Sequence, residues 1–248
     1  MSVWPQVIYS YDGSFAGFLT CVLASFTARE YPFYFYPPGE EQYSFYPLRV
    51  IETDEEKALR VYRSLKTKGS LGLRQMVEYS FLTCLAQRER HIYDYIYTNI
   101  YAGPITDLTD HRYLILSGAV RHLMGEAEQY HGFVRFSDHS GVLVGEITPK
   151  NRVLPLLRPH FCGRFPREAF LLYDKTHKEA LCHAGGVWKI VPLEGLTLDA
   201  PDEEELSYRR LWRQFYDTIA IESRKNSKLR MSHMPKRFWP ELTELQEG

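Results

Sequence analysis

Basic and aromatic side chains occur together near the end of the chain, from Arg224 to Trp239. Lysine and arginine neutralise phosphates, and aromatic rings stack on bases that are unpaired or flipped out. This combination predicts contact with nucleic acid. The alternative is a solvated basic surface, offset by the acidic stretch 199–205, with Phe238 and Trp239 anchoring the chain end. The candidate nucleic-acid-binding residues here are Arg224, Lys225, Asn226, Lys228, Arg230, Lys236, Arg237 and Trp239.

A second basic set lies in the middle of the chain, beside prolines and aromatic residues. Arg158 precedes Pro159-His160-Phe161, and Arg164 precedes Phe165. A guanidinium group can grip a phosphate through two parallel hydrogen bonds, so both arginines are further candidates for nucleic-acid binding. The alternative is that they pair with acidic residues across the fold.

Four titratable residues are candidates for catalytic roles: Asp12, Glu126, His131 and His160. Glu126 and His131 stand where a predicted helix gives way to strands, and they can act as an acid–base pair or share a metal ion. Asp12 lies between a predicted strand and a helix, whose first N–H groups offer a site for an anion. The alternatives are a buried hydrogen-bonding or capping role for Glu126 and His131, and helix capping by Asp12 or Ser14.

The composition excludes several classes of protein. The net charge is −1, so any contact with nucleic acid must come from a local patch. The cysteines Cys21, Cys84, Cys162 and Cys182 form no C-x-x-C pair, which predicts neither a metal nor another cofactor. No secretory signal or membrane-spanning apolar stretch stands out. We therefore expect a cytoplasmic protein with reduced thiols and no membrane contact.

The first half of the chain is predicted to be mainly helical, after a strand–turn–helix start. Apolar residues recur at helical spacing through it, and runs of β-branched and aromatic residues mark short strands. The stretch 31–47 holds four prolines, which predicts an ordered loop. The predicted elements are strands at 7–9 and 48–51, and helices at 15–29, 53–66, 71–87, 90–101 and 109–130.

After residue 130, short strands separated by turn residues predict an antiparallel sheet with flanking helices. Asp138-His139-Ser140-Gly141 predicts a hairpin. The fold class is therefore α+β, with a helical lobe at 1–130 and a sheet lobe at 131–248 forming one intimate unit. The predicted elements are strands at 132–136, 141–147, 169–173, 180–184 and 188–191, a short helix or irregular turn at 152–161, and helices at 203–224 and 237–245.

Several motifs follow one another along the chain, each weak by itself but specific as an ordered set. They are Tyr-Asp-Gly-Ser-Phe-x-Gly at 11–17, Glu126 and His131 with Gly-Phe-x-Arg-Phe at 132–136, Pro-His-Phe-x-x-Arg-Phe at 159–165, and a closing set of Trp212, Phe215, Ile221, Arg224, Asn226 and Met-Pro-Lys-Arg-Phe-Trp at 234–239. Over nearly its whole length, the chain resembles a bacterial family called probable DNA metabolism proteins, a domain of unknown function.

The resemblance implies a DNA-repair setting rather than a particular reaction. Members of the family resemble companions of a radical-SAM protein thought to modify or repair DNA, and some are fused to a uracil-DNA-glycosylase-like domain. DNA, a radical-SAM protein and a glycosylase-like domain are therefore the expected partners. The chain has no C-x-x-x-C-x-x-C motif, so it does not itself hold the radical-SAM cluster.

Three hypotheses for the function remain open at this point. The first is an accessory protein that binds DNA, or docks a radical-SAM or glycosylase partner onto it. The second is an enzyme that acts on a nucleobase or a phosphodiester bond in DNA. The third is a protein–protein adaptor without direct nucleic-acid contact, whose basic face meets an acidic partner.

Overall fold

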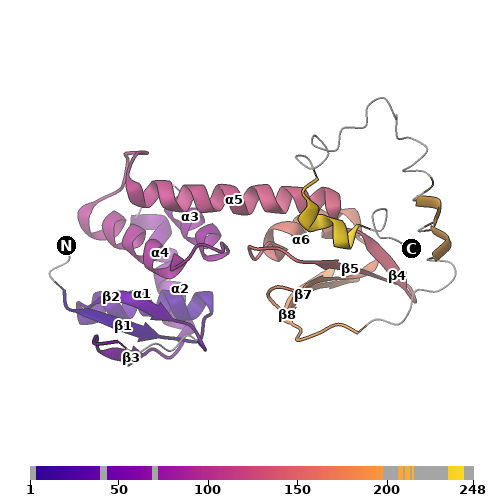
Figure 1. Cartoon of the computed structure of the whole chain (residues 1–248). Helices are drawn as coiled ribbons and strands as arrows, with labels where there is room; N and C mark the ends of the chain where they lie inside the picture. The colour runs from indigo at the N-terminus through magenta and orange to yellow at the C-terminus, as the bar shows by residue number, and fades with distance from the viewer. Residues whose placement is uncertain are drawn as a thin grey trace. The chain divides into compact units, whose positions relative to one another are not determined.

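The computed structural model describes residues 4–39, 44–68, 72–197, 206–208, 210–212, 214 and 234–242. The chain forms two compact units, Met1–Leu123 and Met124–Gly248, and each combines helices with a sheet (Figure 1). The α+β fold class is therefore confirmed. In the part of the chain that is described, no helix is long and apolar enough to cross a membrane.

The sheet of the first unit is parallel. Its strands are β1 (Gln6–Ser10), β2 (Tyr31–Tyr36) and β3 (Leu48–Val50), in the order β2-β1-β3. β1 is the central strand, and its residues Val7, Ile8 and Tyr9 are buried. The helix α1 (Phe15–Ala28) connects β1 to β2, as parallel pairing requires a crossover.

The strand β2 corrects the first part of the predicted loop over 31–47. Residues 37–39 and 44–47 form neither helix nor strand, and residues 40–43 lie outside the described residues. Pro32 lies within β2 and lacks the N–H group that a central strand would donate. It is tolerated because β2 is an edge strand and because the β1–β2 register shifts between Val7 and Ile8, next to Pro32. The aromatic residues of the stretch Tyr31–Tyr36, which have high strand propensity, then decide the local structure.

The remaining helices of the first unit pack around an aromatic core. α2 (Glu55–Lys68) packs against α1, and α3 (Leu73–Phe81) is followed by α4 (Arg88–Tyr97), which continues as a π-helix at Thr98–Ala102. The predicted helix over 71–87 is therefore shorter than expected. The fully or nearly buried aromatic residues of this core are Tyr9, Tyr11, Phe18, Phe35, Phe81, Tyr93 and Tyr95.

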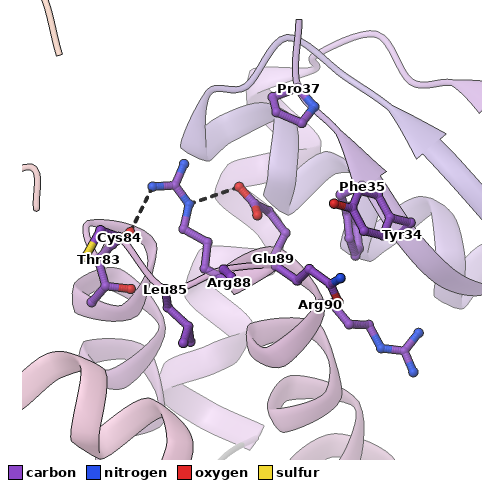
Figure 2. Close-up of a pocket in the computed structure, with 11 residues that line it drawn as sticks. Tyr34, Phe35, Pro37, Thr83, Cys84, Leu85, Arg88, Glu89 and Arg90 are labelled. Carbon is purple, nitrogen blue, oxygen red and sulfur yellow. Dashed lines mark hydrogen bonds and ion pairs between the residues drawn. The ribbon is translucent and has the colours of Figure 1, made fainter. Parts of the chain in front are cut away.

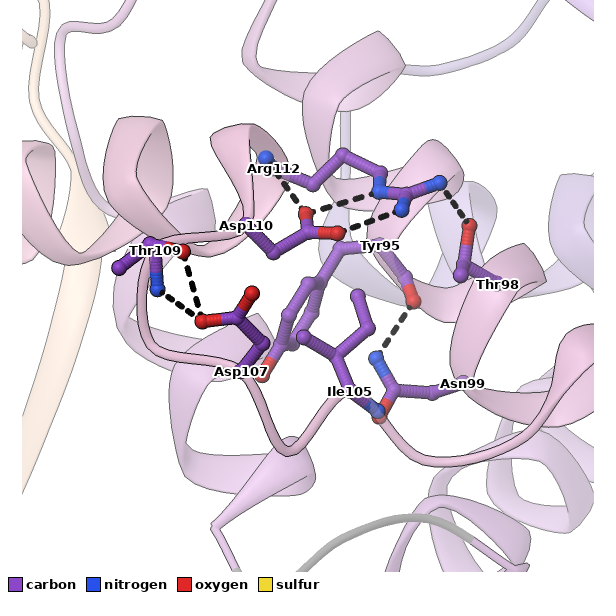
Figure 3. A network of polar contacts seen from close by, with 8 residues as sticks. All are labelled: Tyr95, Thr98, Asn99, Ile105, Asp107, Thr109, Asp110 and Arg112. Atoms are coloured by element: carbon purple, nitrogen blue, oxygen red, sulfur yellow. Dashed lines mark hydrogen bonds and ion pairs between the residues drawn. The ribbon is translucent and has the colours of Figure 1, made fainter.

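A network of polar contacts fixes the loop between α4 and α5 (His111–Phe133) (Figure 3). The buried Asn99 donates from Nδ2 to the Tyr95 carbonyl at 2.8 Å and accepts the Ile105 N–H at 3.1 Å. The Asp110 carboxylate accepts the backbone N–H of Arg112 at 2.9 Å and its Nη2 at 2.6 Å. A carboxylate at this position caps the first turn of α5.

The sheet of the second unit has the order β4-β5-β6-β7-β8. β5 and β6 pair in parallel, because α6 (Leu154–Arg164) crosses between them, and the other neighbours are antiparallel. The expected sheet is thus mostly antiparallel, and α6 packs over β7 and β8 (Figure 1). The strands are β4 (Phe136–His139), β5 (Val142–Ile147), β6 (Ala169–Asp174), β7 (Glu179–Ala184) and β8 (Val187–Pro192).

The predicted strand over 132–136 is wrong in its first part. α5 continues to Phe133, and the Val134 N–H still donates to the Tyr130 carbonyl at 3.2 Å, so β4 begins at Phe136. Packing of the buried Tyr130 extends the helix in spite of Gly132. The hairpin is confirmed: Ser140 and Gly141 both have positive φ angles, 54° and 86°. Such angles are typical of the two-residue turn that joins β4 to β5.

The C-terminal part differs in extent from the prediction. A 3-10 helix covers Lys236–Glu241 at the start of the helix expected over 237–245, of which residues 243–245 lie outside the described residues. Pro240 in this segment disfavours an α-helix. Of the helix expected over 203–224, residues 206–208, 210–212 and 214 are helical, and the other positions lie outside the described residues.

Candidate functional site

The second unit contains a cavity of about 570 Å³ at the C-terminal end of α5. Three stretches that are far apart in sequence meet there: the end of α5 with β4 and β5, the end of α6, and the helical residues near Trp212. The lining residues are His131, Gly132, Val134, Arg135, Phe136, Leu143, Phe161, Arg164, Phe165, Tyr208 and Trp212. The volume and the mainly apolar lining are typical of ligand-binding pockets in proteins.

Arginine side chains lie beside aromatic rings at this cavity. The Arg135 guanidinium carbon is 5.8 Å from the centroid of the Trp212 ring, and that of Arg164 is 5.6 Å from the Phe165 ring. Arg135 also donates from Nη1 to the carbonyl of Gly132 at 2.9 Å, where the α5 dipole is negative. The cavity therefore combines cations held in place with flat apolar surfaces, which suits a ligand that is planar and anionic.

Phe136 packs against the other aromatic residues that form one wall of the cavity. Its ring meets Phe161, Phe165 and Phe170 in edge-to-face geometry, with centroid separations of 5.4, 5.3 and 5.9 Å. This arrangement is the favoured one for aromatic pairs. Gly145 on β5 makes room for it, since a Cβ there would stand 3.2 Å from the Phe136 ring. Packing within the protein therefore fixes the position of this aromatic wall before any ligand binds.

His131 and His160 form a stacked pair next to the cavity, and His131 also lines it. The ring centroids are 4.3 Å apart and the ring planes differ by 21°. The Nε2 atoms of both rings are buried without a hydrogen-bond partner among the described residues, while His131 Nδ1 lies 3.2 Å from Glu128 Oε2. Burial lowers the pKa of His160, and the nearby His131 and Arg164 lower it further. The structure thus brings two of the candidate catalytic residues together.

Glu126 forms the centre of a different, buried cluster. Its carboxylate accepts the backbone N–H groups of Lys150 at 3.0 Å and Asn151 at 2.8 Å, and Asn151 Nδ2 at 2.6 Å. Arg237 Nη1 completes the set at 2.8 Å. Glu126 is 2% exposed and does not line the cavity. These contacts occupy both carboxylate oxygens, which favours the buried hydrogen-bonding role over proton transfer.

Arg237 holds the C-terminal 3-10 helix against α5. In addition to Glu126, it contacts Gln129 Oε1 through Nη2 at 3.1 Å. Phe238 follows it and is buried against the rings of Tyr130 and Phe133, at 4.9 and 5.0 Å. Both residues thus anchor the chain end, as the alternative interpretation of Phe238 supposed.

Asp12 belongs to the first unit and caps α1 together with Ser14. Its carboxylate accepts the N–H of Ser14 at 2.9 Å and the hydroxyl groups of Ser14 and Thr53, each at 2.7 Å. Ser14 in turn accepts the Gly17 N–H at 2.9 Å. Burial raises the pKa of Asp12, but the hydrogen bonds from Thr53 and Ser14 outweigh it and lower the pKa overall. The negative charge of Asp12 already occupies the place that an anionic ligand would take.

The other candidate nucleic-acid contacts divide into two groups. Arg158 lies over the half-exposed Trp188 ring at 4.3 Å, and Lys236 Nζ is 5.8 Å from the Trp239 ring, whose Nε1 donates to the Met234 carbonyl. These basic–aromatic pairs lie on the second unit. Arg224, Lys225, Asn226, Lys228 and Arg230 lie outside the described residues.

The comparison with known families places this site in a family whose function is not assigned. Residues 86–244, more than half of the chain, match the model of a family described as a domain of unknown function, DUF4130. The chain belongs to this family. No curated protein and no solved structure matches it significantly. The DUF4130 match includes every residue that lines the cavity, whereas Asp12 lies outside it.

The sequence predicts only part of the cavity of this DUF4130 member. It indicates His131 and Arg164 as candidates but not the aromatic wall of Phe136, Phe161 and Phe165, although the motifs at 132–136 and 159–165 contain these residues. Aromatic residues inside a motif are ambiguous, since core packing and ligand stacking use the same types. Within the described residues, no group of three or more His, Cys, Asp or Glu side chains is placed to hold a metal ion.

Proposed function

We propose that the chain is a cytoplasmic DNA-repair or DNA-modification accessory protein whose second unit binds DNA. The observation that supports this proposal is the convergence of three separate stretches, all rich in arginine or aromatic residues, on one cavity. Aromatic surfaces stack on unpaired bases of any sequence, because every base has a π-face. The arginines beside them neutralise the phosphates of the same strand.

The charge of the cavity agrees with this proposal. Arg135 and Arg164 line it, and none of its described lining residues is acidic. The cavity is therefore locally positive in a chain whose net charge is −1. A polyanion such as DNA would be attracted to the arginines in this part of the surface. The volume of about 570 Å³ is large enough for an unpaired nucleotide. Because aromatic side chains can stack only on bases that are unpaired or flipped out, a strand with unpaired bases is favoured over an intact duplex.

Fluorescence anisotropy with a fluorescein-labelled oligothymidylate tests the proposal, with the same strand in a duplex for comparison. We expect the single strand to bind more tightly and its affinity to fall steeply with salt, as counterion release requires. Phe165→Ala removes a stacking surface and should cost about 1–3 kcal/mol of binding free energy. Arg164→Ala should reduce the slope of log affinity against log salt by about 0.7.

A matched control is Lys189→Ala. Lys189 is exposed on β8, at the edge of the sheet opposite β4, and does not line the cavity. Lys189→Ala removes one positive charge, as Arg164→Ala does, yet it should change the affinity for the oligothymidylate by less than about twofold. Absence of binding, binding that does not depend on salt, or equal effects of the two charge variants would contradict the proposal.

The partners implied by the family resemblance belong to the same proposal. An accessory protein should hold DNA and a radical-SAM protein, or a glycosylase-like domain, at the same time. Size-exclusion chromatography with light scattering, with the chain, labelled DNA and such a protein mixed in pairs and together, distinguishes the cases. A ternary complex supports the accessory role. Competition between DNA and the partner protein would instead favour the adaptor hypothesis.

A second candidate function is catalysis on the base held in the cavity. It is favoured by His131, which lines the cavity and stacks on His160, and whose buried Nε2 atom has no partner in the described part of the chain. The imidazole of His131 can transfer a proton once a bound ligand moves the ring. His131→Gln should then abolish turnover of a DNA substrate without changing the melting temperature. Equal losses of stability and turnover would point to a packing role.

A further inference from the structure

The first unit contains another cavity, of about 410 Å³, where β2 ends and α4 begins (Figure 2). Pro37, which lines it, directly follows the last residue of β2. The cavity therefore lies beyond the carboxyl end of a parallel strand, a common place for ligands in proteins with such sheets. Its lining residues are Tyr34, Phe35, Pro37 and residues 83–90.

Arg88 is fixed in this cavity before any ligand binds. Its Nε donates to Glu89 Oε1 at 3.0 Å, and its Nη1 donates to the Thr83 carbonyl at 3.2 Å. Its guanidinium carbon also lies 4.6 Å from the centroid of the Phe81 ring. These contacts leave Nη2 without a partner among the described residues. A guanidinium group has no acceptor and stays protonated, so Nη2 is a permanent donor.

Glu89 is fixed in the same way and supplies an acceptor. It is 8% exposed, and its Oε1 accepts both Arg88 Nε and the hydroxyl of the buried Tyr11, each at 3.0 Å. The other oxygen, Oε2, accepts no hydrogen bond from the described residues. Figure 2 shows the Glu89 carboxylate between the Arg88 guanidinium and the rings of Tyr34 and Phe35. Arg88 and Glu89, which are paired through Nε and Oε1, thus offer a donor and an acceptor next to aromatic rings.

The charges around this cavity are balanced, unlike those of the cavity in the second unit. Arg88 is paired with Glu89, and Arg90 is paired with Asp94 through Nε at 3.0 Å. A phosphate-bearing ligand would gain no net attraction from these pairs and would lie close to the Glu89 carboxylate. The chemistry of the cavity therefore favours a neutral ligand with an acceptor and a donor next to each other.

We infer that this cavity binds a neutral, planar heterocycle that carries a ring carbonyl beside a ring N–H, the edge found in uracil and guanine. The carbonyl accepts from Arg88 Nη2, and the ring N–H donates to Glu89 Oε2. The flat apolar walls of Tyr34, Phe35 and Pro37 cover the rest of the ring. Because both side chains are already held in place, binding costs little conformational entropy. This inference is independent of DNA binding by the second unit.

Isothermal titration calorimetry on the full chain with matched pairs of nucleosides provides the test. Uridine is compared with N3-methyluridine, and guanosine with N1-methylguanosine. We expect saturable binding of the unmethylated nucleosides with dissociation constants below about 1 mM. The methylated ones should bind at least about tenfold more weakly, because methylation removes the N–H and leaves a buried carboxylate oxygen unpaired.

Glu89→Gln tests the position of the site. The amide keeps the size of the side chain but replaces one acceptor oxygen by a donor, so uridine should bind about tenfold more weakly and discrimination against N3-methyluridine should disappear. Glu78→Gln on α3 is the matched control. Glu78 also contacts an arginine and a tyrosine hydroxyl, Arg74 and Tyr62, but it lines neither cavity. It should leave both affinities unchanged.

Three results would overturn the inference. The first is the absence of saturable binding for all four nucleosides. The second is equal binding of the methylated and unmethylated forms to the unaltered chain, a comparison that does not depend on how well a variant folds. The third is uridine binding that persists in Glu89→Gln but is lost in Phe165→Ala, which would place the nucleoside in the cavity of the second unit.

Discussion

His160 stacks on His131 with the ring centroids 4.3 Å apart, and neither Nε2 atom has a partner among the described residues. Burial disfavours a proton on His160, and a charged ring there would also face His131 and Arg164. Glu128, which contacts His131 Nδ1, is the nearby group that favours a proton on His160. The pKa of His160 is therefore lowered, and His131, on which it stacks, lines the cavity.

His160 should make the stability of the protein fall in mild acid. The folded-state pKa of His160 is lowered by burial, so the unfolded chain binds the proton more readily. Stability is therefore highest above the ordinary histidine pKa of about 6.5 and decreases as pH falls below it. His160→Phe keeps a stacked ring but removes the titration. It should flatten the decrease in melting temperature between pH 7 and pH 5.

His139→Gln serves as the control for this measurement. His139 ends β4 in the same unit and belongs to no stacked pair of rings in the described part of the chain. Its replacement should preserve the decrease in melting temperature between pH 7 and pH 5. If His160→Phe and the unaltered chain lose melting temperature in parallel, the stacked pair is not the origin of the effect.

Arg237→Ala should affect folding more than DNA binding. The side chain pairs with the buried Glu126, and its loss leaves that carboxylate with backbone and amide donors only. We expect a loss of about 1–3 kcal/mol in the free energy of unfolding, measured by urea denaturation. Glu126→Ala should cost about 3–5 kcal/mol, because it removes the buried carboxylate that pairs with Arg237 and accepts three hydrogen bonds from Lys150 and Asn151.

Lys236→Ala provides the comparison for Arg237→Ala. It removes the neighbouring charge, which lies over the Trp239 ring and contacts no carboxylate among the described residues. Its free energy of unfolding should change by less than about 0.5 kcal/mol. A larger loss of DNA affinity than of stability in Arg237→Ala would show that the arginine contacts DNA directly.

Asp110 should contribute to stability that is lost in strong acid. The hydrogen bond from the Arg112 side chain lowers its pKa to about 2, although burial opposes the shift. The contribution is complete above the ordinary aspartate pKa and disappears as pH falls towards 2. Asp110→Ala also removes the cap of α5, at a cost of about 0.5–2 kcal/mol at pH 7. Circular dichroism during acid titration measures both effects.

The variant Asp107→Ala separates capping from general acid sensitivity. Asp107 forms its own turn with Thr109, at 2.7 and 2.8 Å, but does not contact Arg112. Its removal should leave the midpoint of α5 unfolding in acid unchanged. A shift as large as that of Asp110→Ala would contradict the assignment of the effect to the Asp110–Arg112 contact.

Gly17→Ala should destabilise the first unit through Asp12. A Cβ at Gly17 would stand 2.2 Å from Asp12 Oδ1 and 2.7 Å from Thr53 Oγ1, so the carboxylate must leave its hydrogen bonds. We expect a loss of about 1–3 kcal/mol in thermal unfolding. In an Asp12→Ala background the same substitution should cost clearly less, since the main obstacle is gone. Additive losses would mean that the close approach to Asp12 is not the reason for a glycine at this position.

The sequence by itself determined the local features of this protein. Turn residues such as Ser140-Gly141 and the cap at Asp12–Ser14 act within a few residues of the chain, so their types predict their structure. Periodic apolar residues likewise predicted α1 and the strands β5 to β8. The α+β class and the change of pattern after residue 130 follow from such signals.

Only the tertiary structure decided what depends on distant residues. β2 is a strand because β1 offers it an edge, against the preference of Pro32. Glu126 is buried because Arg237 and the chain at Asn151 reach it from far along the sequence. The cavity also depends on distant residues, because Phe136, Phe165 and Trp212 line it from separate parts of the sequence and their spacing in the chain does not predict this. Burial and pairing across the fold determine which charged or aromatic residues pack and which remain free for a ligand.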